Sequence, residues 1–133
     1  MKHVFDVVGA VIEKEGKILV CQRKDDDQFG SQWEFPGGKV EENEDRVDAL
    51  KRELKEEIRV EVEVGSLIDI FEDEIPTMKI YVYLYRCSIV KGTPSCIECQ
   101  NIKWATIVEI NTLDLAPADR KIADYLLKKS DTP

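Results

Sequence analysis

The chain has 133 residues, of which 43% are hydrophobic and 35% are charged, and its formal net charge is -8. This length favours one domain spanning 1–133, and the composition argues against disorder. No apolar run approaches the roughly 20 residues of a membrane helix, so we expect a cytoplasmic protein without a membrane partner. The acidic balance argues against a nucleic-acid polymer as a partner and suits cations better.

A β-hairpin is the first predicted element. Apolar and β-branched residues recur along 4–24 on both sides of "EKEGK", where Gly16 would supply the positive φ of a tight turn. The next stretch, 25–38, is polar and rich in turn residues. It predicts a loop that leads into a short extended piece ending at Pro36.

Further strands and a terminal helix are predicted in the second half of the chain. "VEVEV" at 60–64 alternates strictly, the segment 78–90 is apolar on both faces as a central strand is, and "IKWATIV" at 102–108 indicates one more strand. After Pro117 the pattern predicts an amphipathic helix with cationic residues in its last turn. Together with a helix at 44–58, these elements predict an α/β sandwich, with a mixed sheet covered by helices.

The helix at 44–58 is the most regular element, because its apolar residues recur at helical spacing: Val47, Leu50, Leu54 and Ile58. Glu53, Glu56 and Glu57 share a second stripe about 100° wide along the edge of the apolar one. Like charges at this spacing repel, unless a cation such as Mg²⁺ uses them together with waters and substrate phosphates. The alternative is a solvated acidic face, but the two glycines at 37–38, which allow a phosphate to approach the backbone closely, favour the cation.

The pattern around this helix resembles the Nudix box of the Nudix hydrolases. Gly38, Glu44 and "RELKEE" at 52–57 match its defined positions and its spacings of five and seven residues, and Arg59 stands where the box has its second glycine. A glycine there adopts the left-handed conformation freely, so the Arg costs on the order of 1 kcal/mol. Asn43, where MutT-like relatives usually have Gly, is a milder case.

The resemblance implies a Nudix-type α/β/α sandwich and a requirement for Mg²⁺ or Mn²⁺. It implies these roles: metal ligation by Glu53, Glu56 and Glu57, a backbone ligand or close approach at Gly38, orientation of the glutamates by Arg52, and support of the loop by Glu44. A general base is also needed. Glu98 has a placement similar to that of the loop glutamate which serves as base in several MutT-like enzymes; Glu53 and Glu56 are rival bases, and a surface role is the alternative for Glu98.

The resemblance extends beyond the box to the MutT-like branch, which hydrolyses nucleoside triphosphates. "WEFPGGKVE" at 33–41 and "LAPAD" at 115–119 are similar to that branch, and the Asp in "LAPAD" is more similar to the CTP and 5-methyl-dCTP subgroup. The implied reaction converts (d)CTP, or an oxidised or modified dNTP such as 8-oxo-dGTP, to the monophosphate and pyrophosphate. Alternatives are hydrolysis of ADP-ribose or another nucleoside diphosphate derivative, and a non-catalytic nucleotide-binding module. The chain would act as a monomer or a homodimer.

The expected substrate-binding residues are Arg23, Phe35, Gly37, Gly38, Lys39 and Asp119. Arg23 could meet a phosphate or a base, or form a surface ion pair, and Phe35 could stack on a base or pack in the core. Asp119, as an acceptor-only group, would pair with the exocyclic amine of cytosine or the N–H edge of guanine. Its alternative role is that of an ordinary helix-start carboxylate.

The four cysteines, at 21, 87, 96 and 99, are expected to be reduced thiols. Cys96 and Cys99 form a lone CxxC without a second pair of ligands, so a structural zinc is not expected. If Glu98 between them is the base, both thiols would be exposed and sensitive to oxidation.

Overall fold

The computed structural model describes residues 2–26 and 30–130. Its strands are β1 (His3–Lys14), β2 (Lys17–Gln22), β3 (Trp33–Glu34), β4 (Gly37–Lys39), β5 (Glu61–Ile75), β6 (Met78–Lys91) and β7 (Asn101–Ala105). Its helices are α1 (Arg46–Ile58), α2 (Ile107–Ile110) and α3 (Pro117–Ser130). The predicted hairpin, central strand and two long helices are confirmed. Within these two ranges, no helix has the length and apolar character needed to cross a membrane.

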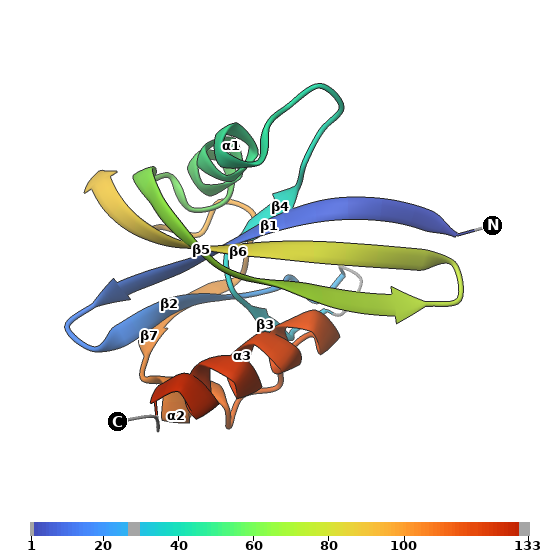
Figure 1. Cartoon of the computed structure of the whole chain (residues 1–133). Helices are drawn as coiled ribbons and strands as arrows, with labels where there is room; N and C mark the ends of the chain where they lie inside the picture. Colours follow the sequence, from blue (N-terminus) through green and yellow to red (C-terminus); the bar gives the residue numbers. More distant parts are fainter. Residues whose placement is uncertain (1, 27–29, 131–133) are drawn as a thin grey trace.

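The sheet is mixed, and β1 and β6 lie at its centre. These two strands run parallel, from His3 opposite Met78 to Ile12 opposite Cys87. β2 and β4 pair antiparallel with β1, β5 pairs antiparallel with β6, and β3 and β7 both pair with β2. Figure 1 shows α1 on one face of the sheet and α3 on the other. The α/β/α sandwich expected from the sequence is therefore confirmed.

Two apolar layers hold the helices against the sheet. Because side chains alternate along a strand, Val8 of β1 packs in the layer under α1 and Val11 packs in the layer under α3. Leu50 and Leu54 of α1 are fully buried in the first layer, and Ile122 of α3 is buried in the second. Each such side chain contributes about 1.5–3 kcal/mol on burial. Both helices are thus fixed relative to β1.

The first long helix, α1, has a capped start and a left-handed end. Asp45 caps the start, where its Oδ1 accepts a hydrogen bond from the backbone N–H of Asp48 at 2.8 Å. At the other end Arg59 has φ 63° and ψ 38°, and its N–H donates to the carbonyl of Lys55. Arg59 therefore adopts the conformation that a glycine would adopt freely. Asn43, just before the helix, is also left-handed, with φ 64°.

The predicted strand at 102–108 is wrong in its second half, because β7 ends at Ala105 and α2 begins at Ile107. The Thr106 side chain accepts from the backbone N–H of Glu109 at 3.2 Å, and the Glu109 carboxylate accepts from the Thr106 N–H at 2.9 Å. This reciprocal capping box starts a helix. It overrides the β-branched run that indicated a strand.

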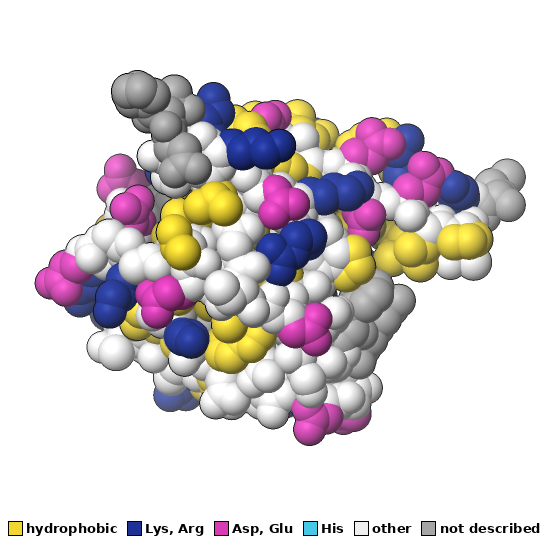
Figure 2. All heavy atoms as spheres, turned by 90° about the horizontal axis from the view of Figure 1, so that it is seen from below, with side chains coloured by type: hydrophobic (Ala, Val, Ile, Leu, Met, Phe, Trp, Pro, Cys, Tyr) yellow, Lys and Arg dark blue, Asp and Glu magenta, His cyan; other side chains and the backbone are white. Residues whose placement is uncertain are grey.

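The face over α3 carries charges of both signs. Figure 2 shows Lys and Arg side chains there interspersed with Asp and Glu and with small apolar patches. Lys121 ties the helix to β5, since its Nζ donates to the carbonyl of Glu72 at 2.6 Å and lies 3.3 Å from Asp73 Oδ1. Such exposed ion pairs contribute little individually. The attachment of α3 to the sheet therefore rests mainly on its buried apolar side.

Candidate active site

Two glycines in β4 allow close approaches that a side chain would block. A Cβ on Gly37 would lie 1.9 Å from the carbonyl oxygen of Val8, and a Cβ on Gly38 would lie 2.3 Å from the carboxyl carbon of Glu53. Real Cβ atoms do not approach other atoms so closely. The structure therefore brings the Glu53 carboxylate directly against the backbone of Gly38, at the edge where β4 pairs with β1.

One guanidinium joins the loop, the strand and the helix. Arg52 donates to both carboxylate oxygens of Glu44, at 2.8 and 3.0 Å, and to the carbonyl of Lys39 at 3.0 Å. It also donates to Glu53 at 3.0 Å and to Glu56 at 3.2 Å. The hydrogen bonds from Arg52 lower the pKa of Glu44 below its usual range. The ion pair that the resemblance implies for Arg52 is thus present in the fold.

Glu57 is the one buried charged residue among the described part of the chain, with 8% of its surface exposed. Burial, followed by the charge of Glu34, raises the pKa of its carboxyl well above the usual range. Its Oε1 has no hydrogen-bond partner within residues 2–26 and 30–130. Its backbone carbonyl accepts from the N–H groups of Ile97 and Glu98, at 3.0 and 3.3 Å. The backbone of Glu57 is therefore tied to the segment between β6 and β7, while the charge of Arg23 only partly opposes the rise in the pKa of its side chain.

The other carboxylates differ in exposure. The Glu53 side chain is 16% exposed and that of Glu56 is 49% exposed. Burial raises the pKa of Glu53 against the opposing effect of Arg52, and the charges of Glu56 and Glu98 raise it further. Glu98, on the exposed segment between β6 and β7, is therefore close enough to influence Glu53. The structure brings the expected acidic residues to one side of α1.

These residues fit a hard divalent cation, although no three His, Cys, Asp or Glu side chains in the described ranges converge on a complete metal site. The unpartnered oxygen of Glu57 and the cradle that Gly38 leaves for Glu53 are two features that a cation would satisfy. Mg²⁺ takes only a few protein carboxylates and obtains its other oxygens from water and substrate phosphates. The donor set is accordingly of the right kind.

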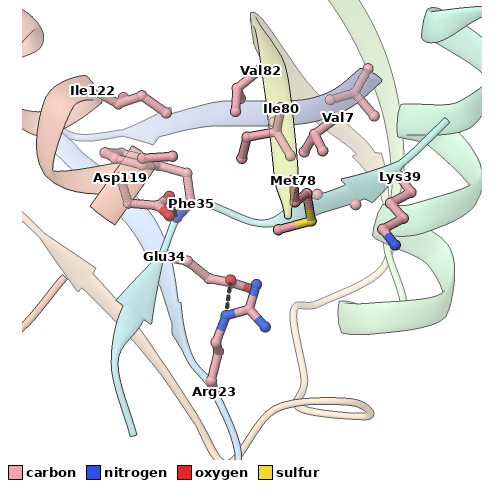
Figure 3. A pocket seen from close by; sticks show the side chains of 15 residues that line it. Val7, Arg23, Glu34, Phe35, Lys39, Met78, Ile80, Val82, Asp119 and Ile122 are labelled. Atoms are coloured by element: carbon pink, nitrogen blue, oxygen red, sulfur yellow. Dashed lines mark hydrogen bonds and ion pairs between the residues drawn. The ribbon is translucent and has the colours of Figure 1, made fainter. Parts of the chain in front are cut away.

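A cavity of about 260 Å³ begins at β4 and extends toward α3. Its apolar lining includes Val7, Phe35, Met78, Ile80, Val82 and Ile122, and its charged lining consists of Arg23, Glu34, Lys39 and Asp119. Figure 3 shows Asp119 and Phe35 at one end of the cavity and Lys39 at the other. Because Gly37 and Gly38 also line it, the cavity and the carboxylates of α1 meet at β4.

Asp119 combines a helix-start position with a place in the cavity wall. It lies in the first turn of α3, and its Oδ1 accepts a hydrogen bond from the backbone N–H of Phe35 at 2.9 Å. Burial of the carboxyl, reinforced by the charge of Glu34, raises its pKa to about 8. The role of Asp119 as an acceptor-only group stays a prediction. A carboxyl that keeps its proton can also donate.

Three other residues were expected to bind substrate, and the structure places each of them in a different setting. Arg23 forms an ion pair with Glu34, with 2.6 Å between Nε and Oε1, inside the cavity lining rather than on the outer surface (Figure 3). Phe35 is 5% exposed and packs in the apolar layer under α3, so the packing interpretation is confirmed. Lys39 is exposed, with its Nζ 4.1 Å from the centre of the Phe5 ring.

All four cysteines are free, as expected, but their exposure differs from the prediction. Cys99 is buried, with 8% exposed, and Cys96 is partly exposed. Sequence reasoning also missed Glu34 in the cavity and the position of Cys21 beside Cys99. The alternation of Trp33 and Phe35 around Glu34 was an available signal for the first. The second depends on strand pairing, which the local sequence does not reveal.

Comparisons with known proteins agree with this geometry. Residues 2–126 match the NUDIX domain family. The chain is 37% identical over 116 residues to the CTP pyrophosphohydrolase of Escherichia coli K12, covering 87% of this chain and 86% of that protein. It is 33% identical over 130 residues to the 8-oxo-dGTP diphosphatase of Haemophilus influenzae, covering 97% and 96%. The solution structure of the E. coli ORF135 protein superposes with a TM-score of 0.84 at 32% identity, covering 99% of this chain and 95% of that one.

Proposed function

Because the chain belongs to the NUDIX domain family and is a hydrolase acting on phosphoric anhydride bonds, we propose that its substrate is a nucleoside triphosphate. The proposed substrates are (d)CTP, or an oxidised or modified dNTP such as 8-oxo-dGTP, and the products are the monophosphate and pyrophosphate. One observation carries this proposal. The cavity of about 260 Å³ opens at Gly37 and Gly38, so a base in the cavity would direct its phosphates toward the carboxylates of α1.

The phosphate end of the site is assigned to α1 and β4. Nudix hydrolases generally need a divalent cation, and Glu53, Glu56 and Glu57 would hold Mg²⁺ or Mn²⁺ together with the backbone of Gly38. When bound, such a cation offsets charge on the phosphates and lowers the pKa of the attacking water. Arg52 fixes Glu53 and Glu56 through its hydrogen bonds at 3.0 and 3.2 Å.

The proton of the attacking water is assigned to Glu98. This carboxylate is exposed, and its backbone is tied to the carbonyl of Glu57 at 3.3 Å, which keeps it beside the acidic side of α1. Water attacks phosphorus in line, the carboxylate accepts its proton, and the bond to the pyrophosphate oxygen breaks. Glu53 is the rival base, although its position against Gly38 suits a ligand better.

The base end of the site is assigned to the cavity. Asp119 keeps one oxygen on the Phe35 N–H and leaves the other for the substrate, where a protonated carboxyl offers both a donor and an acceptor. The apolar walls exclude water from this contact, which raises the energetic difference between a matched and a mismatched base edge. Arg23 and Glu34 supply a second polar edge near Asp119, away from Lys39 (Figure 3).

The test separates by anion-exchange chromatography the products formed with Mg²⁺ from dCTP, CTP, 8-oxo-dGTP, dGTP and ADP-ribose. The triphosphates would give a monophosphate and pyrophosphate, whereas ADP-ribose would give AMP and ribose 5-phosphate. Glu53→Gln should lower kcat by about 100-fold or more, because the amide is a poorer cation ligand and no base. Glu63→Gln, an exposed carboxylate on β5, is the matched control and should keep full activity. Full activity of Glu53→Gln, or turnover of ADP-ribose alone, would overturn the proposal.

Base recognition needs its own variant. Asp119→Asn replaces the titrating carboxyl by an amide of the same shape, which always carries both a donor and an acceptor. Because the ionised carboxylate can only accept, we expect the ratio of kcat/KM for dCTP and 8-oxo-dGTP to differ from that of wild type by about tenfold at pH 9, above the pKa of about 8, and little at pH 6. An unchanged ratio would reduce Asp119 to a helix-start residue.

A further inference from the structure

Three thiols meet on the α1 side of the sheet. Cys21 projects from β2 and is 1% exposed, and Cys96 and Cys99 belong to the irregular segment 92–100 between β6 and β7. The sulfur of Cys99 is in hydrogen-bond contact with the thiols of both Cys21 and Cys96. All three are free, and all three contribute to the apolar layer under α1.

This thiol cluster, made of Cys21, Cys96 and Cys99, lies against the candidate active site. Between the two cysteines of the segment, the N–H groups of Ile97 and Glu98 donate to the backbone carbonyl of Glu57, at 3.0 and 3.3 Å. One residue later on α1, the carbonyl of Ile58 accepts from the N–H of Ser95 at 3.0 Å. The segment that carries the two thiols thus also holds the last turn of α1, including a residue assigned to cation binding.

We propose that Cys96 and Cys99 form an oxidisable site at which a hydroperoxide converts the two thiols to a disulfide, and that this bridge reversibly inhibits the hydrolase. Cys96 is the partly exposed member and gives a small peroxide access to the cluster. Bridging Cys96 to Cys99 changes only an irregular segment. Bridging Cys21 to Cys99 would instead pull on the register of β2 and β7, where Cys21 lies opposite Ile102.

The redox step balances without a cofactor. One of the two sulfurs, as its thiolate, attacks one peroxide oxygen, the O–O bond breaks, and the departing hydroxide takes a proton to leave as water. The other sulfur then attacks the sulfenic sulfur, the S–O bond breaks, and a second water forms with the S–S bond. Overall, two thiols give two electrons and two protons to one H₂O₂. A thiol reductant reverses the step by exchange.

Inhibition follows from the position of the bridge. Closing a bond between Cys96 and Cys99 draws together the two ends of the stretch that holds Ile97 and Glu98. Their hydrogen bonds to Glu57 and the side chain of Glu98 must then shift. Because small displacements of catalytic groups cause large losses of rate, we expect pyrophosphate release to fall by about tenfold. This consequence rests on the proposed function, whereas formation of the bridge does not.

The test treats the full chain with H₂O₂, then counts free thiols and maps disulfide-linked peptides by mass spectrometry. The proposal expects loss of two of the four thiols, a bridge between Cys96 and Cys99, and return of both thiols with dithiothreitol. Four remaining thiols would overturn it, and so would a bridge through Cys21. This readout stands even if the chain proves inactive on every nucleotide tested.

Activity then separates inhibition from simple damage. Wild type should lose about tenfold in pyrophosphate release on oxidation and recover on reduction, whereas Cys96→Ser and Cys96→Ala should keep their rates in H₂O₂. Cys87→Ser is the matched control, because Cys87 is buried in β6 and its Sγ donates to the carbonyl of Tyr85 at 3.9 Å. It should respond as wild type does. Equal inactivation of the Cys96 variants, or a mapped bridge without inhibition of an active enzyme, would contradict the proposal.

Discussion

Glu57 and Asp119 both have carboxyl groups with raised pKa values, but the surroundings of the two groups differ. Near Glu57 the structure leaves an oxygen without a hydrogen-bond partner and gathers further acids. Near Asp119 a backbone N–H already occupies one oxygen, and the surroundings are largely apolar. We propose that a cation completes the first environment and that a proton completes the second. The site therefore has a charge-seeking end around Glu57 and a hydrogen-bonding end around Asp119, although both ends are built on a carboxyl group.

The largest effect is expected from a substitution at the charge-seeking end of the site. Glu57→Gln should weaken Mg²⁺ binding and lower the rate of hydrolysis by about 100-fold, because the buried amide cannot offset the charge of the ion. Calorimetric titration with Mg²⁺ and pyrophosphate release measure the two effects. Asp119→Asn is the matched variant at the other end and should bind Mg²⁺ as wild type does. Equal loss of Mg²⁺ binding in both variants would erase the distinction between the two ends.

Substitutions of the adjacent Gly38 and Gly37 should have different effects, the first on activity and the second on stability. In Gly38→Ala the new methyl group meets the end of the Glu53 side chain, which can move, so the protein should fold while losing about 100-fold in activity. In Gly37→Ala it meets the backbone of Val8, which cannot move easily, so the free energy of unfolding should fall by about 1–3 kcal/mol. Urea denaturation and pyrophosphate release measure the two losses. Similar stability in both variants would contradict this assignment.

The pH dependence of the free energy of unfolding tests the hydrogen-bonding end of the site. The pKa of Asp119 is about 8 in the folded protein, against 3.8 for an ordinary Asp, so the folded state binds this proton more tightly. Its stabilising contribution is full below pH 4 and is lost as the pH rises through about 8. Without divalent cations, the melting temperature should fall between pH 6 and pH 9. Asp119→Asn should flatten this slope, while Glu57 contributes a remaining slope of the same sign.

The smallest expected effect lies outside both ends. Arg59→Gly should raise the free energy of unfolding by about 0.5–1 kcal/mol, because glycine adopts φ 63° without the steric penalty of a Cβ. The gain is limited by the greater freedom of glycine in the unfolded chain. Thermal unfolding would detect it, and pyrophosphate release should not change. A destabilised variant would mean that the Arg59 side chain makes a net favourable contribution.

The sequence predicted the charge-seeking end better than the hydrogen-bonding end, for a physical reason. Glu53, Glu56 and Glu57 lie on one helix, where spacing alone determines which side chains share a stripe. Glu34 lies on β3 and Arg23 directly follows β2, so their ion pair depends on β2 and β3 being adjacent. The pairing of strands cannot be read from local periodicity, so Glu34 was missed although Arg23 was predicted.

Two other differences have local causes. The residues after Trp104 are rich in β-branched side chains, which favoured a strand. The Thr106–Glu109 capping box instead stabilises the start of a helix there. The raised pKa of Asp119 could not be predicted, because it depends on burial and on the charge of Glu34 rather than on residue type. The missing glycine left open whether α1 ends in a left-handed residue or by another geometry, and the structure shows that Arg59 is left-handed.

The parallel pairing of β1 with β6 also has a consequence for synthesis on the ribosome. Phe5 finds its partner Ile80 only after most of the chain has been made, whereas the register of β1 with its early neighbour β2 covers only Glu13 and Lys14 among the described residues. At about 5–20 residues per second, the apolar first strand waits several seconds for its main partner. The nascent chain therefore exposes an unpaired, apolar strand edge during translation. Neither end of the site can assemble before β6 has emerged.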